Sequence, residues 1–64
     1  MRANVDAQLT PDEIASLREV SKGSLQRAIP LGNQVRLILS GFIHETSGVL
    51  MLTEMGRVRV AMGR

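Results

Sequence analysis

Basic and amide side chains in the middle of the chain have the chemistry needed to bind a nucleic acid. Three basic residues occur there without an acidic residue between them: Lys22, Arg27 and Arg36. Lysine and arginine contact phosphate oxygens, whereas the amides of Asn33 and Gln34 can pair with base edges in the major groove. The sequence therefore predicts a duplex DNA site made of these five residues. A solvated helix surface of average charge is the alternative, and three phosphate contacts predict only weak, salt-sensitive binding.

The residue types that catalysis and metal binding require are scarce. The chain has no cysteine and one histidine, His44, and it contains no phosphate-binding or nucleophile motif. The adjacent carboxylates Asp12 and Glu13 are explained as the acidic first turn of a helix. A chain of 64 residues also lacks room for a sizeable pocket. We therefore expect no catalytic residue, no metal site, no cofactor and no small-molecule substrate.

Length and composition predict one small domain with a thin core. The chain has 64 residues, of which 44% are hydrophobic. Its single aromatic residue, Phe42, excludes the aromatic platforms that stack unpaired bases. No apolar run approaches the roughly 18 residues that a membrane-spanning helix needs, and residues 1–6 show no export-signal pattern. We expect a cytoplasmic protein with a flexible lead-in over residues 1–8 and one domain over residues 9–62.

The clearest local signal is a helix start at Thr10. Thr10 and Glu13 have the spacing of a capping box, in which each side chain accepts a hydrogen bond from the other residue's backbone N–H. Pro11 suits the first helical position, and Gly23 is a typical helix stop. The pattern predicts a helix over residues 11–22. Three of its residues are expected to face the core: Ile14, Leu17 and Val20.

A short helix and a longer one are predicted next. Ser24 could cap the short helix over residues 24–29, and Pro30 then opens a helix over residues 31–40. Four apolar residues recur at helical spacing and are predicted to face inward: Leu31, Val35, Ile38 and Leu39. The same spacing predicts that Asn33, Gln34 and Arg36 point outward.

The last third of the chain predicts a hairpin and a final element. Gly48 lies in a short loop between two β-prone runs, residues 42–45 and 49–52, which is typical of a hairpin. Thr53 is a typical helix cap and predicts a helix over residues 54–62. The strict alternation of Arg57-Val58-Arg59-Val60 favours a strand instead, so helix and strand are both open for residues 57–62.

Two short strings in the second half of the chain have a distinctive order. The first is Leu39, Gly41, Phe42 and Ile43, and the second, after the hairpin, is Leu52, Thr53, Gly56 and Arg57. Together they resemble the winged helix-turn-helix family. The resemblance implies an α+β fold with three N-terminal helices (the second one short), a two-stranded hairpin wing and a C-terminal helix. It also implies a transcription regulator that reads duplex DNA with residues 31–40.

A second function is compatible with the same scaffold, namely a protein-interaction or homo-oligomeric assembly module without a nucleic-acid role. The hairpin loop, residues 45–48, carries an acid and no arginine, and the net charge is only +2. The last helix could also line a homodimer contact through Val58, Ala61 and Met62, because additional apolar burial stabilises a small core. Both functions remain open from the sequence.

Overall fold

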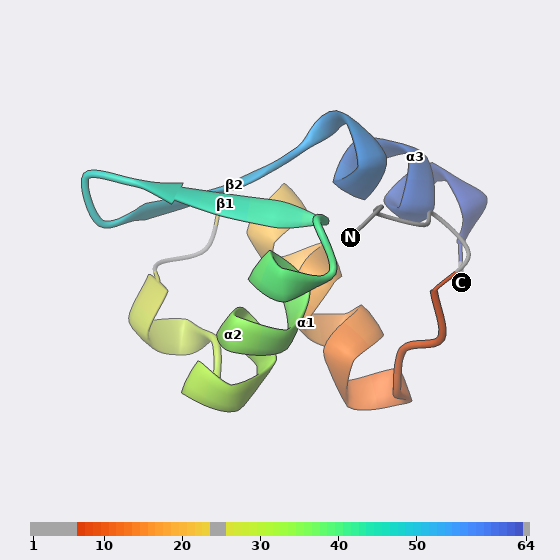
Figure 1. Ribbon diagram of the computed structural model, residues 1–64, viewed down its shortest axis with the longest axis horizontal. Coiled ribbons are helices and arrows are strands. Elements are labelled where there is room, and N and C mark those ends of the chain that lie inside the picture. Colours follow the sequence, from red (N-terminus) through yellow and green to blue (C-terminus); the bar gives the residue numbers. More distant parts are fainter. Residues whose placement is uncertain (1–6, 24–25, 64) are drawn as a thin grey trace.

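The protein has an α+β fold in which helices pack against a two-stranded hairpin (Figure 1). The structure is a computed structural model, and it describes residues 7–23 and 26–63. The described residues form the following elements in chain order: α1 (Pro11–Ser21), the 3₁₀ helix η1 (Gln26–Ala28), α2 (Leu31–Leu39), β1 (Ile43–Thr46), β2 (Val49–Leu52) and α3 (Glu54–Met62).

Two α-helices, not the three that the sequence predicted, precede the hairpin in the described part of the chain. The expected short second helix is the single 3₁₀ turn η1. It cannot extend into a longer helix because Pro30 follows closely, and the residue before a proline avoids helical geometry. The predicted cap of that helix, Ser24, lies outside the described residues.

The capping box predicted at Thr10 is confirmed. The Thr10 hydroxyl accepts from the Glu13 N–H at 3.1 Å, and the Glu13 carboxylate accepts from the Thr10 N–H at 2.9 Å. The helix ends at Ser21, and Gly23 turns the chain with a φ of 82°. The predicted inward side is also confirmed, because Leu17 and Val20 are buried and Ile14 packs against the core.

α2 ends in a Schellman motif that leads directly into the hairpin. Gly41 adopts a φ of 82°, and its N–H donates to the Ile38 carbonyl at 3.0 Å. The N–H of Phe42 donates to the Leu37 carbonyl, also at 3.0 Å. A hydrophobic pair usually accompanies this motif, and here Phe42 and Leu37 both belong to the buried core.

The hairpin and the last helix are both confirmed. β1 and β2 are antiparallel, with His44 opposite Met51 and Thr46 opposite Val49. Ser47 and Gly48 form the connecting turn with φ values of 53° and 78°, as a two-residue hairpin turn requires. Residues 57–62 are helical rather than extended, since they belong to α3.

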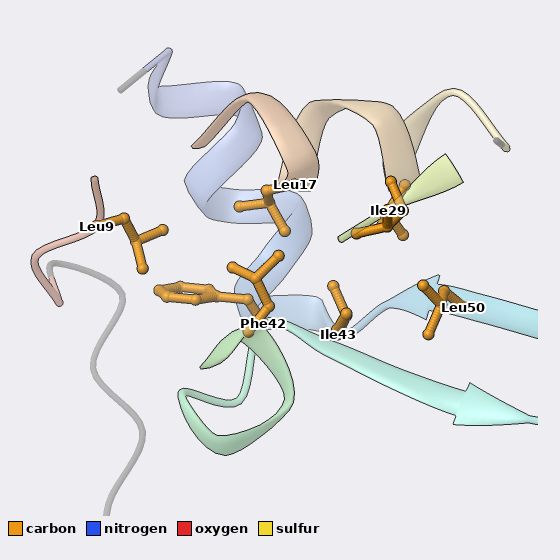
Figure 2. Close-up of a cluster of buried hydrophobic side chains, with 8 residues drawn as sticks. Leu9, Leu17, Ile29, Phe42, Ile43 and Leu50 are labelled. Atoms are coloured by element: carbon orange, nitrogen blue, oxygen red, sulfur yellow. The ribbon is translucent and has the colours of Figure 1, made fainter. Parts of the chain in front are cut away.

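The core lies between the helices and the inner face of the hairpin (Figure 2). Its buried apolar members are Leu9, Leu17, Val20, Ile29, Leu37, Phe42, Ile43 and Leu50. Each element except η1 contributes a side chain to this core or packs one against it. α3 packs against the core through Met55 and Val60. Phe42 and Leu37 are fully buried at 0% exposure, so the end of α2 lies at the centre of the core.

A joint between the end of α2 and the start of α3 closes the fold, and we define it by Gly41, Phe42, Thr53 and Gly56. The Thr53 hydroxyl donates to the Gly41 carbonyl at 2.6 Å and accepts from the Gly56 N–H at 3.0 Å. The Thr53 N–H donates to the Phe42 carbonyl at 3.0 Å. Gly56 lies so close to that carbonyl that a Cβ at residue 56 would overlap its oxygen.

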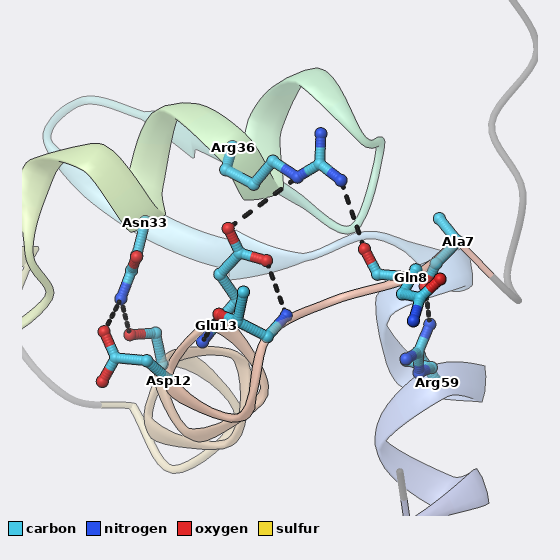
Figure 3. A network of polar contacts seen from close by, with 9 residues as sticks. Ala7, Gln8, Asp12, Glu13, Asn33, Arg36 and Arg59 are labelled. Carbon is cyan, nitrogen blue, oxygen red and sulfur yellow. Dashed lines mark hydrogen bonds and ion pairs between the residues drawn. The ribbon is translucent and has the colours of Figure 1, made fainter.

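Two arginines hold the chain just before α1 (Figure 3). The carbonyl of Ala7 accepts from Arg59 at 2.6 Å, and that of Gln8 accepts from Arg36 at 3.2 Å. The other residues of the expected lead-in, 1–6, lie outside the described part of the chain.

Removing the Thr10 hydroxyl tests the start of α1. Thr10→Ala leaves the Glu13 N–H without its acceptor and is expected to cost about 1 kcal/mol. In a domain of this size such a loss lowers the melting temperature by roughly 4–8 °C, measured by circular dichroism. Thr10→Ser keeps the oxygen and should melt close to the parent. Equal melting of the alanine and serine variants would contradict the cap.

Two glycine substitutions test the joint. Gly56→Ala should destabilise the fold by about 1–3 kcal/mol, because its methyl group meets the Phe42 backbone and not a movable side chain. Gly32→Ala is the matched control within α2, where a Cβ meets nothing within 4 Å. That variant should gain up to about 1 kcal/mol from helix propensity. Chemical denaturation measures both, and opposite signs are expected; a stabilising Gly56→Ala would contradict the joint.

Candidate interaction surface

The outward face of α2 carries an uninterrupted row of apolar side chains, which we call the α2 stripe (Leu31, Val35, Ile38 and Leu39). Their exposed fractions are 72%, 48%, 40% and 77% respectively. The sequence placed these four residues in the core, and that prediction is wrong. The four residues do lie on one side of a helix, but that side faces solvent, so α2 is rotated about its own axis relative to the prediction. Singly scattered apolar residues are ordinary on a surface, whereas a contiguous row marks a candidate binding site.

Gln34 explains part of this rotation, because it is buried on the inner face of α2. Its side-chain N–H₂ donates to the carbonyls of Ile29 and Gln26 at 2.7 and 3.0 Å, and its oxygen is 3.3 Å from the Gln26 amide nitrogen. The Gln26 carbonyl in η1 also accepts from the Ile29 N–H at 3.0 Å, so the Ile29 carbonyl, in the bend before Pro30, is the one that depends on this amide. A buried carbonyl without a donor is costly, so the amide faces inward.

The side of α2 next to α1 is held by Asn33 and Arg36 (Figure 3). The Asn33 amide donates to Asp12 at 3.0 Å and to the Ser16 hydroxyl at 2.9 Å. The Arg36 guanidinium lies 3.8 Å from a carboxylate oxygen of Glu13. The structure therefore engages three predicted DNA contacts, Asn33, Arg36 and the buried Gln34, in bonds within the chain.

The two remaining predicted phosphate contacts lie elsewhere on the surface. Lys22 caps the end of α1 and pairs with Glu19 at 3.4 Å, and Arg27 is exposed on η1. Arg36 pairs with residue 13 in the first turn of α1, so it is separated from Lys22 by roughly 14 Å along that helix. The five predicted residues do not gather into one basic surface.

Carboxylates flank α2 on both sides. Asp12 and Glu13 lie on the α1 side, where they contact Asn33 and Arg36. On the hairpin side, Glu45 accepts from the Gln26 amide at 2.7 Å. The α2 stripe itself carries no cation, so a row of phosphates placed along the outward face of α2 would meet apolar side chains there.

α3 exposes a smaller apolar surface than α2. Of its predicted dimer contacts, Val58 is 47% exposed and Ala61 is exposed, whereas Met62 is half-buried. These side chains stay a candidate contact, but the structure gives them less exposed apolar surface than the α2 stripe has.

Arg59 is a buried cation that the sequence did not reveal as such. It is 7% exposed, its guanidinium carbon lies 5.6 Å from the Phe42 ring centroid, and it donates to Ala7. Cations over aromatic faces are attracted by the ring electrons. Arg59 follows Gly56 by three residues and so lies on the same side of α3, and this spacing is the sequence pattern from which its burial could be inferred.

Comparison with known proteins gives no match, whether to family models, to curated proteins or to solved structures. Within residues 7–23 and 26–63, no helix combines the length and apolar character needed to cross a membrane. The same residues contain no group of three or more side chains that could hold a metal ion. Among the large apolar side chains of the described residues, Leu31 and Leu39 of the α2 stripe have the highest exposed fractions.

Substituting Gln34 separates a structural role from base recognition. Gln34→Ala leaves the Ile29 carbonyl without its 2.7 Å donor and is expected to lower the free energy of unfolding by about 1–3 kcal/mol. Arg27→Ala, on the exposed surface of η1, should stay within about 0.5 kcal/mol of the parent. Urea denaturation measures both variants. A Gln34→Ala chain as stable as the parent would show that this amide is free for an external ligand.

Proposed function

We propose that this chain is a protein-interaction module, built on a winged-helix-like scaffold, whose binding surface is the α2 stripe. The observation that carries the proposal is the outward exposure of four neighbouring apolar side chains on one helix. Helices that present such a row bind other helices or hydrophobic grooves through residues at i, i+4 and i+7 spacing. The polar residues beside the stripe support the proposal, because their bonds to α1 and η1 make the surface rigid before binding.

The proposed scaffold rests on the order of the elements: α2 is followed by the hairpin and then by α3. In the winged helix-turn-helix family the recognition helix is followed by the wing in the same way. The eight residues that suggested the winged helix-turn-helix resemblance include Gly41, Phe42, Thr53 and Gly56, which form the joint. Their roles are in folding, so the resemblance supports a scaffold more directly than an activity.

The competing function is a reader of duplex DNA that uses residues 31–40. It requires Asn33 and Gln34 to leave four hydrogen-bond partners within the chain before they reach a base. It also requires phosphates to lie along the α2 stripe, which carries no cation. Each broken bond to a buried or charged group subtracts from the affinity, which favours the interaction module.

Titration with duplex DNA distinguishes the two functions. The interaction module predicts only a weak attraction without sequence preference, lost as salt rises from about 50 to about 200 mM. A DNA reader predicts sequence-specific binding whose salt slope falls by about one unit in Arg27→Ala and Arg36→Ala. In that case Asn33→Ala would alter the preference at one base pair. Fluorescence anisotropy of labelled duplexes measures these quantities, and specific binding would overturn the proposal.

A photo-reactive residue tests the surface directly in cells that produce the protein. Placed at Leu39, it should give a discrete protein adduct, and Val35→Glu should remove that adduct by putting a charge in the stripe. Placed at Ala15, which is exposed on α1, it should give none. Equal labelling from both positions, or no adduct from any stripe position, would contradict the proposed surface.

A further inference from the structure

Three of the four residues of the α2 stripe are spaced evenly about Val35. Leu31 and Leu39 lie four residues before and four residues after Val35, so the three form one ridge along the helix surface. Ridges of this four-residue spacing pack into each other in the commonest class of helix pairs, with the axes crossing at about −50°. A ridge with a leucine at equal distance on each side of its centre matches its own reversed copy.

Resting on the proposed function, we propose that the occupant of the α2 stripe is a second copy of this chain, antiparallel across a two-fold axis at Val35. In this arrangement each Leu31 packs against Leu39 of the second copy, and the two Val35 side chains meet at the axis. A two-fold contact requires such a self-complementary surface, because where residue i of one copy meets residue j of the other, residue j of the first copy must meet residue i of the second.

The charges of α2 are compatible with self-pairing. The stripe carries no charge, so two copies can approach without placing like charges opposite each other. Arg36, the charged residue of α2, is already paired with Glu13 on the side of the helix. The antiparallel orientation also brings the positive end of one helix dipole near the negative end of the other. A nucleic acid or an acidic peptide would instead need cations within the stripe.

The size of the surface sets the expected strength. The four side chains expose on the order of 400 Å² of apolar surface, similar to the largest patch on a typical monomer. Two such surfaces bury less than the roughly 1,200–2,000 Å² of a stable complex. The dimer should therefore dissociate on dilution, and it should be observed at hundreds of micromolar rather than at nanomolar concentration.

Sedimentation equilibrium across about 10 µM to 1 mM tests the second copy. The apparent mass should rise from the 7.0 kDa of one chain toward twice that value. Val35→Glu and Val35→Lys should each stay monomeric over this range, because two like charges would meet at the axis. A mixture of the two variants should recover the dimer, since opposite charges then meet. Val58→Glu on α3 is the matched control and should dimerise as the parent does.

Introduced cysteines test the orientation, because the chain has none of its own. When Leu31→Cys and Leu39→Cys chains are mixed and oxidised, the antiparallel pair predicts a disulfide that joins the two variants. Each variant alone should cross-link at least tenfold less, whereas a parallel pair would cross-link each variant with itself. Val58→Cys chains should form little disulfide-linked dimer. Efficient cross-linking of this variant would show that the interface lies on α3. Circular dichroism of each variant confirms that the exposed substitutions leave the fold intact.

The outcomes separate this inference from the function on which it rests. A parent chain that stays monomeric at 1 mM overturns the second copy. If the adduct at residue 39 then contains a different protein, the interaction module stands with another partner. If no adduct forms either, both proposals fail. A dimer that survives Val35→Glu but not Val58→Glu also overturns the inference, because its contact lies on α3.

Discussion

The end of α2 and the start of α3 meet at a contact that orients the hairpin between them. The Thr53 hydroxyl bonds the Gly41 carbonyl and caps α3, and the Thr53 N–H bonds the Phe42 carbonyl. Gly56 allows the helix to touch the Phe42 backbone. This fixes the direction in which the hairpin leaves α2 and holds the Phe42 ring at the centre of the core. It also places Arg59 over that ring, so the segment before α1 is secured by the same contact.

Local signals in the sequence predicted the helix start at Thr10, the glycine turns, the hairpin and the cap of α3. Each of these depends on residues within a few positions of one another, so spacing is sufficient. The rotation of α2 was not predictable in this way. Its apolar residues occupy much of the helix circumference, and periodicity does not say which part faces the core. Tertiary partners decided it, through the carbonyls that Gln34 satisfies and the α1 side chains that hold Asn33.

The same physics explains why the predicted DNA site and the observed surface differ. Polar residue types suited to base recognition are equally suited to satisfying backbone carbonyls and attaching one helix to another. In a chain of 64 residues without disulfides, such attachments substitute for part of a large core. Asn33, Gln34 and Arg36, predicted to be available for a ligand, are therefore engaged within the chain, and the apolar side chains predicted to lie in the core are exposed. Arg59 shows the same exchange on α3, where a charged residue takes a core position.

Arg59 and Arg18 have one more effect, on how the domain connects to other polypeptide. Arg59 in α3 donates to the carbonyl of Ala7. Arg18 in α1 donates to the carbonyl of Gly63, which follows Arg59 by one helical turn. Both described ends of the chain are therefore bonded at α3. Arg36 of α2 bonds the neighbouring Gln8, whereas the α2 stripe lies on the outward face of that helix. The two described ends, residues 7 and 63, therefore lie on the same side of the domain, where polypeptide joined to either of them would leave it.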